Sequence, residues 1–510
     1  MFTKNKADEY VLNNKNKINR EFKPEYHFSA EIGWINDPNG FCRFNGRYHL
    51  FYQFYPYSSL EGNKHWGHAV SDDLIKWEHL PVALAPDSEY DKDGCWSGTA
   101  IVSEGMLYLI YTGVHDGKQE QCVAYSADGV NFEKYAGNPV IGEKNPAPGV
   151  NIRDFRDPKI IRAGENLYCI IGANSKAVVY KSKSSIFEWE YAGDLLDKKL
   201  GVMWECPDYF EESGRAVFVS SICGENRENK DKNKFVFFAN PTYFILENNG
   251  SNSFECFECF ENLPVTYRYF DELENGFDFY APQTFQTPEN KHIMIAWMYT
   301  FGERIVTDSG NLNHGWANCM TLPREISIKN DRLYQNPVKS IEQYRRNEII
   351  CENFGFDSRT NSFYSNNNIN FRYIDGVLSF PAMNGKCSEV IISADISGAK
   401  KFTVILPAGA LEFDTEHGHI TFDRTGFGYD LRSDGQKEKN EREVRKIDFD
   451  RKDMLNLRIF IDVSAVEVFI NGGEKVISSR VYREDKDYKT EFKSEGLAVI
   501  KEIRKYDIVV

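Results

Sequence analysis

Three acidic residues stand just before prolines in similar local sequences: Asp37 in WINDPNG, Asp157 in FRDPK and Glu205 in MWECPD. Hydrolysis of a glycosidic bond typically uses two carboxyl groups that flank the bond. One of them attacks or stabilises the sugar carbon, and the other protonates the leaving oxygen. The three acids are therefore candidates for this chemistry, provided that the fold brings them together.

Each of these acids also has an ordinary structural interpretation. The sequence N-D-P-N-G around Asp37 is rich in turn formers, which favours an Asx-type turn when the motif is taken alone. Glu205 can be an exposed residue at a strand start, and Asp157 can form a surface ion pair with Arg156. Because neighbouring strand residues point to opposite faces, we favour separate roles, with Arg156 as a donor to substrate oxygens and Asp157 as an acceptor.

The neighbours of Glu205 predict its state of protonation. Met203, Trp204, Cys206 and Pro207 surround it in the sequence. A carboxyl group among apolar neighbours loses solvation, which disfavours the charged form and raises its pKa. A raised pKa is the property that a general acid needs, so the sequence predicts this role for Glu205.

The prolines belong to a repeat that predicts how the acids meet. Similar apolar segments occur at residues 48–53, 108–113, 168–173, 217–222 and 292–297, and ten residues before them stand Pro38, Gly98, Pro158, Pro207 and Pro282. Such units, separated by Gly, Asn and Asp turns, are typical of a five-bladed β-propeller. The first strand of each blade then lines a central channel, and the residues before the prolines converge on one mouth of it.

The spacing of the acids requires one irregularity. Glu205 lies two residues before its proline, whereas Asp37 and Asp157 each lie one residue before theirs. Because side chains alternate along a strand, these positions face opposite sides of a regular strand. We therefore expect a bulge or an irregular strand start that re-aims one of the acids.

The second half of the chain has a different pattern. Alternating strands resume near residue 350, N-G-G at 471–473 predicts a hairpin turn, and no acids stand beside prolines. This pattern is typical of a two-sheet β-sandwich. We therefore predict an all-β protein with an N-terminal extension (1–28), a five-bladed β-propeller (29–328), a linker of some helical character (329–350) and a C-terminal β-sandwich (351–510).

Composition and charge disfavour several classes of function. The net charge is −15 and no basic run stands out, which argues against a nucleic-acid partner because phosphate binding needs clustered cations. No apolar stretch reaches the about eighteen residues of a membrane span, and the polar N-terminus does not read as a signal peptide. Eleven scattered cysteines favour free thiols and a cytoplasmic protein, although secretion by a route that the sequence does not display stays open.

Taken in order, the motifs make the chain similar to glycoside hydrolase family 32, the β-fructosidases. The resemblance rests on WINDPNG, FRDPK and MWECPD together with HLFYQ (49–53), HWGHAVSDDLIKWEHLPVAL (65–84), WSGTA (96–100), DFYAPQTF (278–285), MTLPRE (320–325) and FIDVSAVEVFINGGEKVISSRVY (460–482). It covers the chain from about residue 25 to the end. Many invertase-like members carry Asn-Pro where this chain has Tyr55-Pro56, and an aromatic residue there resembles the intracellular sucrose-6-phosphate hydrolases of the family.

The resemblance implies a retaining fructosidase. Asp37 is then the nucleophile on the anomeric carbon of a fructofuranoside, Glu205 is the acid/base, and Asp157 holds fructose hydroxyls. The same resemblance places further residues around the fructose: Asn36, Gln53, Trp66, Trp96, Ser97, Arg156, Tyr280 and Trp297. It implies neither a cofactor nor a metal, and we interpret Cys256-x-x-Cys259 as structural or incidental thiols.

The expected substrate is a terminal β-fructofuranoside, with sucrose 6-phosphate or sucrose preferred over fructo-oligosaccharides. A phosphate on the leaving group needs a cation, and Lys64, Arg227 and Arg304 are candidates, although solvated surface charge is the ordinary interpretation of each. Fructan exo-hydrolysis and fructosyl transfer are the enzymatic alternatives. A non-catalytic carbohydrate-binding propeller, which predicts loss of an acid, and a propeller acting on arabinan are weaker alternatives. The sequence leaves the oligomeric state open.

Overall fold

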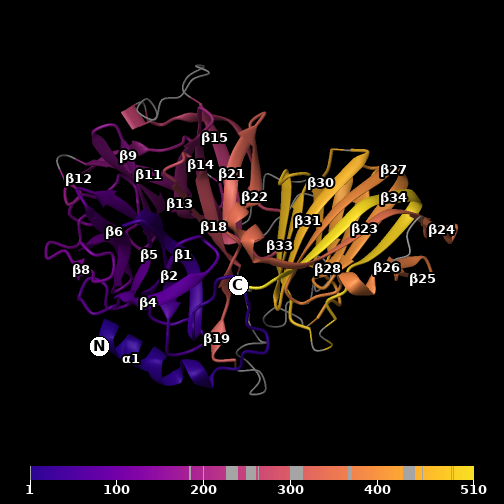
Figure 1. Ribbon diagram of the computed structural model, residues 1–510. Coiled ribbons are helices and arrows are strands. Elements are labelled where there is room, and N and C mark those ends of the chain that lie inside the picture. The colour runs from indigo at the N-terminus through magenta and orange to yellow at the C-terminus, as the bar shows by residue number, and fades with distance from the viewer. Residues whose placement is uncertain are drawn as a thin grey trace.

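Strands dominate the computed structural model, which describes residues 2–510 except 183–184, 199, 225–238, 248–259, 262, 299–313, 366–369, 429–442, 451, 484 and 486. The described helices are α1 (Lys4–Asn14) and the short 3-10 helices η1 (Lys15–Lys17), η2 (Lys339–Tyr344) and η3 (Pro381–Met383). None of these described helices is long and apolar enough to cross a membrane. Figure 1 shows a ring of sheets beside a second body of layered sheets, which confirms the predicted all-β fold.

Each blade of the propeller is an antiparallel sheet built mainly from consecutive strands. The blades are β1 (Gly33–Phe44), β2 (Arg47–Tyr55), β3 (His65–Ser71) and β4 (Trp77–Leu84); β5 (Gly94–Ser103), β6 (Met106–His115), β7 (Lys118–Ser126) and β8 (Glu133–Lys134); β9 (Phe155–Ala163), β10 (Asn166–Ala173), β11 (Lys176–Ser182) and β12 (Trp189–Asp194); β13 (Met203–Glu212), β14 (Arg215–Cys223), β15 (Ala239–Glu247) and β16 (Thr266–Glu272); and β17 (Tyr280–Gln286), β18 (His292–Met298), β21 (Arg324–Lys329) and β22 (Arg332–Pro337). The short strands β19 (Trp316–Ala317) and β20 (Cys319–Met320) pair with β1 and β18. The first strands contact one another in the closed ring β1-β5-β9-β13-β17.

Polar side chains join neighbouring first strands. The Thr99 hydroxyl on β5 donates to the Pro158 carbonyl of β9 at 3.0 Å. The Lys159 ammonium on β9 pairs with the Asp208 carboxylate of β13, which in turn accepts from a backbone amide of β17. Because Thr99 and Asp208 are buried and Lys159 is largely covered, these bonds satisfy polar atoms that have little access to water, which favours one register between adjacent blades.

The expected irregularity is present as a bulge in the first strand of each blade. On β13, pairing shifts between Glu205 and Asp208, and on β9 the matching shift follows Arg156. The bulged residues Asp157 and Cys206 have left-handed φ angles of 64° and 47°. Glu205 therefore corresponds to Arg156 rather than to Asp157, and the bulge brings its carboxyl to the same channel mouth.

The predicted linker needs correction. Residues 332–337 form β22, the outer strand of the fifth blade, and β23 (Arg345–Asp357) of the second domain begins before residue 351. The turn Asn330-Asp331 has positive φ at both residues, 51° and 59°, which is the geometry that closes a two-residue hairpin onto β21. The connection itself is short, and its helical character is the 3-10 helix η2.

The C-terminal domain is a sandwich whose two layers share two long strands. Its strands are β23, β24 (Ser362–Ser365), β25 (Arg372–Ile374), β26 (Val377–Ser379), β27 (Ser388–Leu406), β28 (Gly409–Asp414), β29 (His419–Asp423), β30 (Val444–Asp448), β31 (Met454–Asp462), β32 (Ala465–Ile470), β33 (Lys475–Arg480) and β34 (Glu491–Ile508). β27 and β34 pair along almost their whole length, with register shifts near residues 393–401. Before the shifts β27 pairs with β31, and after them with β28, so both long strands bend from one layer into the other around an apolar core.

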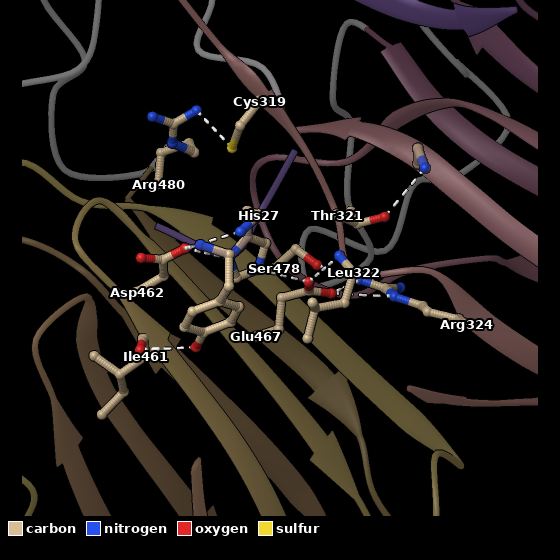
Figure 2. A network of polar contacts seen from close by, with 12 residues as sticks. His27, Cys319, Thr321, Leu322, Arg324, Ile461, Asp462, Glu467, Ser478 and Arg480 are labelled. Carbon is tan, nitrogen blue, oxygen red and sulfur yellow. Dashed lines mark hydrogen bonds and ion pairs between the residues drawn. The ribbon is translucent and has the colours of Figure 1, made fainter. Parts of the chain in front are cut away.

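A buried ionic network joins the two domains (Figure 2). The His27 ring contacts Asp462 at 2.9 Å through Nδ1 and Glu467 at 3.0 Å through Nε2. Glu467 also accepts from the Leu322 amide at 2.6 Å and from the Arg324 guanidinium of the propeller. Burial disfavours the charged form of His27, but its hydrogen bonds to the two carboxylates outweigh this and raise its pKa to about 9.

Replacing His27 by Gln is expected to destabilise the protein. The change leaves Asp462 buried without its cation and Glu467 with Arg324 alone, and breaking a buried ion pair typically costs about 3 kcal/mol or more in the free energy of unfolding. Because the folded pKa is above that of an unfolded histidine, the His27 contribution is complete below about pH 6.5 and is lost as pH rises through about 9. Urea unfolding between pH 6 and pH 9.5 measures both effects.

The exposed His417 provides the matched control, since His417→Gln changes the same residue type at the surface. A His27→Gln protein as stable as the wild type, with the same pH dependence of unfolding, contradicts the role given to this network.

Candidate active site

The three acids predicted from the sequence meet at one mouth of the propeller channel. Asp37 comes from β1, Asp157 from β9 and Glu205 from β13. The Cys206 thiol lies between the two aspartates, with Sγ at 3.5 Å from Asp37 Oδ2 and at 3.6 Å from Asp157 Oδ2. The Cys206 amide also donates to Asp157 at 2.9 Å. Residues from three blades thus form a single carboxyl cluster.

Asp37 has the properties of an anionic group held in a desolvated site. Burial raises the pKa of its carboxyl, and the charge of Glu205 raises it further. The Ser97 hydroxyl opposes this by donating to Oδ2 at 2.6 Å, and Asn36 also donates to the carboxyl. The net effect is a raised pKa of Asp37, although two hydrogen-bond donors stabilise its ionised form. A poorly solvated carboxylate held by donors is suited to attack a carbon atom.

Glu205 differs from the expectation of a raised pKa. Burial does raise the pKa of its carboxyl, but the charge of Arg156 and the hydrogen bond from the Tyr280 hydroxyl outweigh burial and lower it. Arg156 donates to Oε1 at 2.6 Å through Nη2 and at 3.1 Å through Nε. The apolar neighbour Trp204 points away into the core. The residues next to Glu205 in the sequence are therefore not the ones that surround its carboxyl group.

Asp157 completes the cluster as a deeply buried carboxyl. Burial raises its pKa to about 7; the Arg156 charge opposes this, whereas the charges of Glu205 and Asp37 reinforce it. The Asp157 amide donates to the Thr112 hydroxyl at 2.9 Å, which fixes the bulged backbone. Because these carboxyls are close together, ionisation of one disfavours ionisation of the others, so the three titrate as a coupled set.

Aromatic rings and amide groups surround the carboxyl cluster. Trp34 donates from its indole to Asn36 at 2.9 Å, and its ring packs edge-on against Trp297 at 6.1 Å. Trp297 in turn packs edge-on against Tyr280 at 6.3 Å. The Arg156 guanidinium lies 6.0 Å from the Trp96 ring. Rings and donors of this kind match the C–H faces and hydroxyls of a sugar.

Two further residues predicted for the pocket, Gln53 and Trp66, are almost fully buried next to this wall. Gln53 and Trp66 are 1% and 0% exposed. Gln53 donates to the Cys95 carbonyl at 3.1 Å, and the Trp66 indole donates to the Trp96 carbonyl at 3.0 Å. They therefore hold the start of β5, and with it the ring of Trp96, from inside blade 1.

Sequence reasoning missed several residues of the site. Trp34 stands within the WINDPNG motif and could have been found there. Gln119 accepts from Arg156 Nη1 at 3.2 Å, and Cys223 lies 3.2 Å from Glu205 Oε2. Neither belongs to a motif, because both lie on strands that only the folded blades bring to the channel.

Of the three cations considered for binding a substrate phosphate, the structure describes Lys64 alone. Lys64 is nearly buried, pairs with Glu61 and lies 5.7 Å from the Trp34 ring. Burial lowers the pKa of its ammonium, against the raising effect of Glu61 and Asp37. Arg227 and Arg304 lie outside the described residues, as does the Cys256-x-x-Cys259 pair.

A coupled carboxyl cluster, an arginine donor and a ring of aromatic side chains at the mouth of a five-bladed propeller define a glycosidase. Residues 27–337 match the glycosyl hydrolases family 32 N-terminal domain, and residues 356–507 match the family 32 C-terminal domain. The chain therefore belongs to glycosyl hydrolase family 32.

Individual relatives agree with the family assignment. A sucrose-6-phosphate hydrolase of Escherichia coli is 35% identical, over 94% of this chain and 93% of the relative. The Bombyx mori β-fructofuranosidase BmSUC1 has a TM-score of 0.76 and 31% identity, covering 99% of this chain and 98% of that one. A sucrose-6-phosphate hydrolase structure from Lactobacillus gasseri has the same fold, with a TM-score of 0.80, 24% identity and coverage of 100% and 99%.

Removal of the Ser97 hydroxyl is expected to shift the acid limb of activity. Ser97→Ala deletes the 2.6 Å donor to Asp37, so the pKa of Asp37 rises by about 0.5 to 1 unit. Activity that needs ionised Asp37 then falls off at higher pH than in the wild type. The measurement is the pH dependence of kcat/KM for fructose release, with Ser103→Ala at the far end of the same strand as control. An unshifted acid limb contradicts this account of Asp37.

Proposed function

We propose that the protein is a retaining β-fructofuranosidase that hydrolyses sucrose 6-phosphate and sucrose. The observation that carries this proposal is the carboxyl cluster, in which Asp37 and Glu205 come from different blades yet influence each other's charge. In the first step the Asp37 carboxylate attacks the anomeric carbon of fructose, and the glycosidic C–O bond breaks. Glu205 gives its proton to the departing oxygen. In the second step Glu205 takes a proton from water, whose oxygen displaces Asp37 and releases fructose.

The low pKa of Glu205 in the free site has a direct consequence for this proposal. Glu205 is ion-paired with Arg156 when no sugar is present. Sugar hydroxyls that recruit the Arg156 guanidinium weaken that pair and raise the proton affinity of Glu205, because burial is then opposed mainly by the hydrogen bonds from Tyr280 and Cys223. Substrate binding thus converts Glu205 toward the acid form, while Asp157, as an acceptor, holds fructose hydroxyls.

The phosphorylated substrate is favoured by the kind of relative and by the chemistry of the site. The Escherichia coli and Lactobacillus gasseri relatives are sucrose-6-phosphate hydrolases by name. Lys64 supplies a cation next to Trp34 and Asp37, which we propose binds the phosphate in exchange for Glu61. A charged sugar phosphate does not cross membranes unaided, and the nine cysteines recorded for the described chain are free thiols, so we propose a cytoplasmic location.

The acid role of Glu205 is tested by the dependence on leaving group. Glu205→Gln keeps the shape of the side chain but has no proton to give, so fructosides with poor leaving groups are expected to slow about 1,000-fold or more. Activated fructosides, whose leaving groups need no proton, are expected to slow far less. Steady-state kinetics on sucrose and an aryl fructoside measures the difference. Equal slowing of both substrates contradicts the acid role.

The substrate preference is tested by kcat/KM for sucrose 6-phosphate, sucrose and a fructan on the same enzyme. We expect sucrose 6-phosphate to be preferred, and Lys64→Met to lower kcat/KM for it about 10-fold more than for sucrose. Lys64→Arg is expected to keep the preference because it keeps the charge. Lys92→Met, at an exposed cation of the neighbouring loop, serves as control. Preference for the free sugar or the fructan rejects the phosphorylated substrate.

A further inference from the structure

The acid/base carboxyl has a third partner that neither the motifs nor the proposed mechanism uses. Cys223 ends β14, and its Sγ lies 3.2 Å from Glu205 Oε2 and 2.9 Å from the Tyr280 hydroxyl. Tyr280 donates to the same Oε2. We propose that Cys223 is a positioning residue that sets the proton affinity of Glu205 through this shared contact. The inference rests on the proposed function of Glu205 as the acid/base.

Glu205, Tyr280 and Cys223 contact one another in a closed triangle, to which Tyr280 and Cys223 each contribute one proton. The Tyr280 hydroxyl has one proton and gives it to Glu205 Oε2. The thiol of Cys223 also has one proton, which it donates either to the carboxylate directly or to the Tyr280 oxygen. In both arrangements the thiol adds a donor that stabilises charge on Glu205, because a donor to Tyr280 strengthens the donation by Tyr280 in turn.

The thiol acts as a neutral donor here. Burial raises the pKa of Cys223, and the adjacent charge of Glu205 raises it further. Burial and the same charge also raise the pKa of Tyr280. Neither group therefore ionises in the working range, and neither competes with Asp37 as a nucleophile. Their effect on the reaction passes through the carboxyl of Glu205.

The backbone holds Cys223 in place from the adjoining strand. The Val202 amide donates to the Cys223 carbonyl at 2.7 Å. Gly201 has a left-handed φ of 60°, and a Cβ there would lie 2.2 Å from the same carbonyl oxygen. Only a glycine permits this close approach. The thiol is thus fixed opposite the start of β13, where Met203 pairs with Cys223 two residues before the acid/base.

This placement has opposite effects on the two chemical steps. A donor to the carboxylate makes Glu205 a weaker base and a stronger acid once it is protonated, and it lowers the pH at which the proton is lost. Removing the thiol raises the pKa of Glu205. The protonated form needed for the first step then persists to higher pH, while fructosyl transfer to water is assisted by a more basic carboxylate.

The test compares Cys223→Ala, which removes the donor, with Cys223→Ser, which keeps a donor at nearly the same place. We expect the alkaline limb of kcat, which reports the substrate complex, to move up by about 0.5 to 1 pH unit in Cys223→Ala and to stay within about 0.2 unit of the wild type in Cys223→Ser. Cys387→Ala, a half-buried thiol of the sandwich, is the control and should leave the profile unchanged.

A readout besides activity separates this inference from the proposed function. The carboxylate stretch of Glu205, obtained as an infrared difference against Glu205→Gln, titrates in the folded protein without substrate. We expect its midpoint to rise in Cys223→Ala. An unchanged midpoint and limb in Cys223→Ala, or equal shifts in Cys223→Ala and Cys223→Ser, overturn the role of the thiol. A wild-type protein that releases no fructose overturns the proposed function instead, whatever the infrared titration shows.

Discussion

Repulsion among Asp37, Asp157 and Glu205 is the constraint around which the channel mouth is arranged. Three carboxyls in one desolvated site favour protonation, and burial alone raises the pKa of each. The neighbouring groups shift the three pKa values by different amounts. Arg156 and a phenol keep Glu205 ionised in the empty site, whereas Asp157 has donors too few to offset burial. The cluster therefore retains a proton near neutral pH on Asp157, whereas under the proposed mechanism Glu205 gains its proton when its pair with Arg156 weakens.

The same structural feature, a β-bulge in the first strand of each blade, positions these groups in the propeller. Each first strand has a bulge at the position of Pro38, Gly98, Pro158, Pro207 or Pro282, and in the third blade this bulge lets Arg156 and Asp157 both reach the cluster. In the fourth blade the same bulge offers Glu205 and Cys206. The second domain contributes at a distance, because Asp462 and Glu467 hold the segment that leads into β1 through His27. Site and domain interface are thus linked along the same stretch of chain.

The sequence was sufficient for the architecture and for the acids. A repeat of apolar strands behind prolines predicted five blades, and the offset of Glu205 required the bulge that the structure contains. The chemistry around Glu205 was not predictable in the same way. The sequence neighbour Trp204 points into the core, while the groups that set the pKa of Glu205 arrive from other strands, and no local pattern records such contacts. In the same way, the motif names Trp66 without recording that its indole donates to the Trp96 carbonyl.

The central claim is that one sugar lies between Asp37 and Glu205. The most direct measurement is a crystal structure of the Asp37→Ala protein with bound sucrose, because this variant lacks the attacking carboxylate but keeps the rest of the cluster. We predict that the anomeric carbon of fructose faces position 37 and that the glycosidic oxygen lies about 3 Å from the Glu205 carboxyl. Sucrose bound away from the channel mouth, or with its glycosidic oxygen against another acid, contradicts the account.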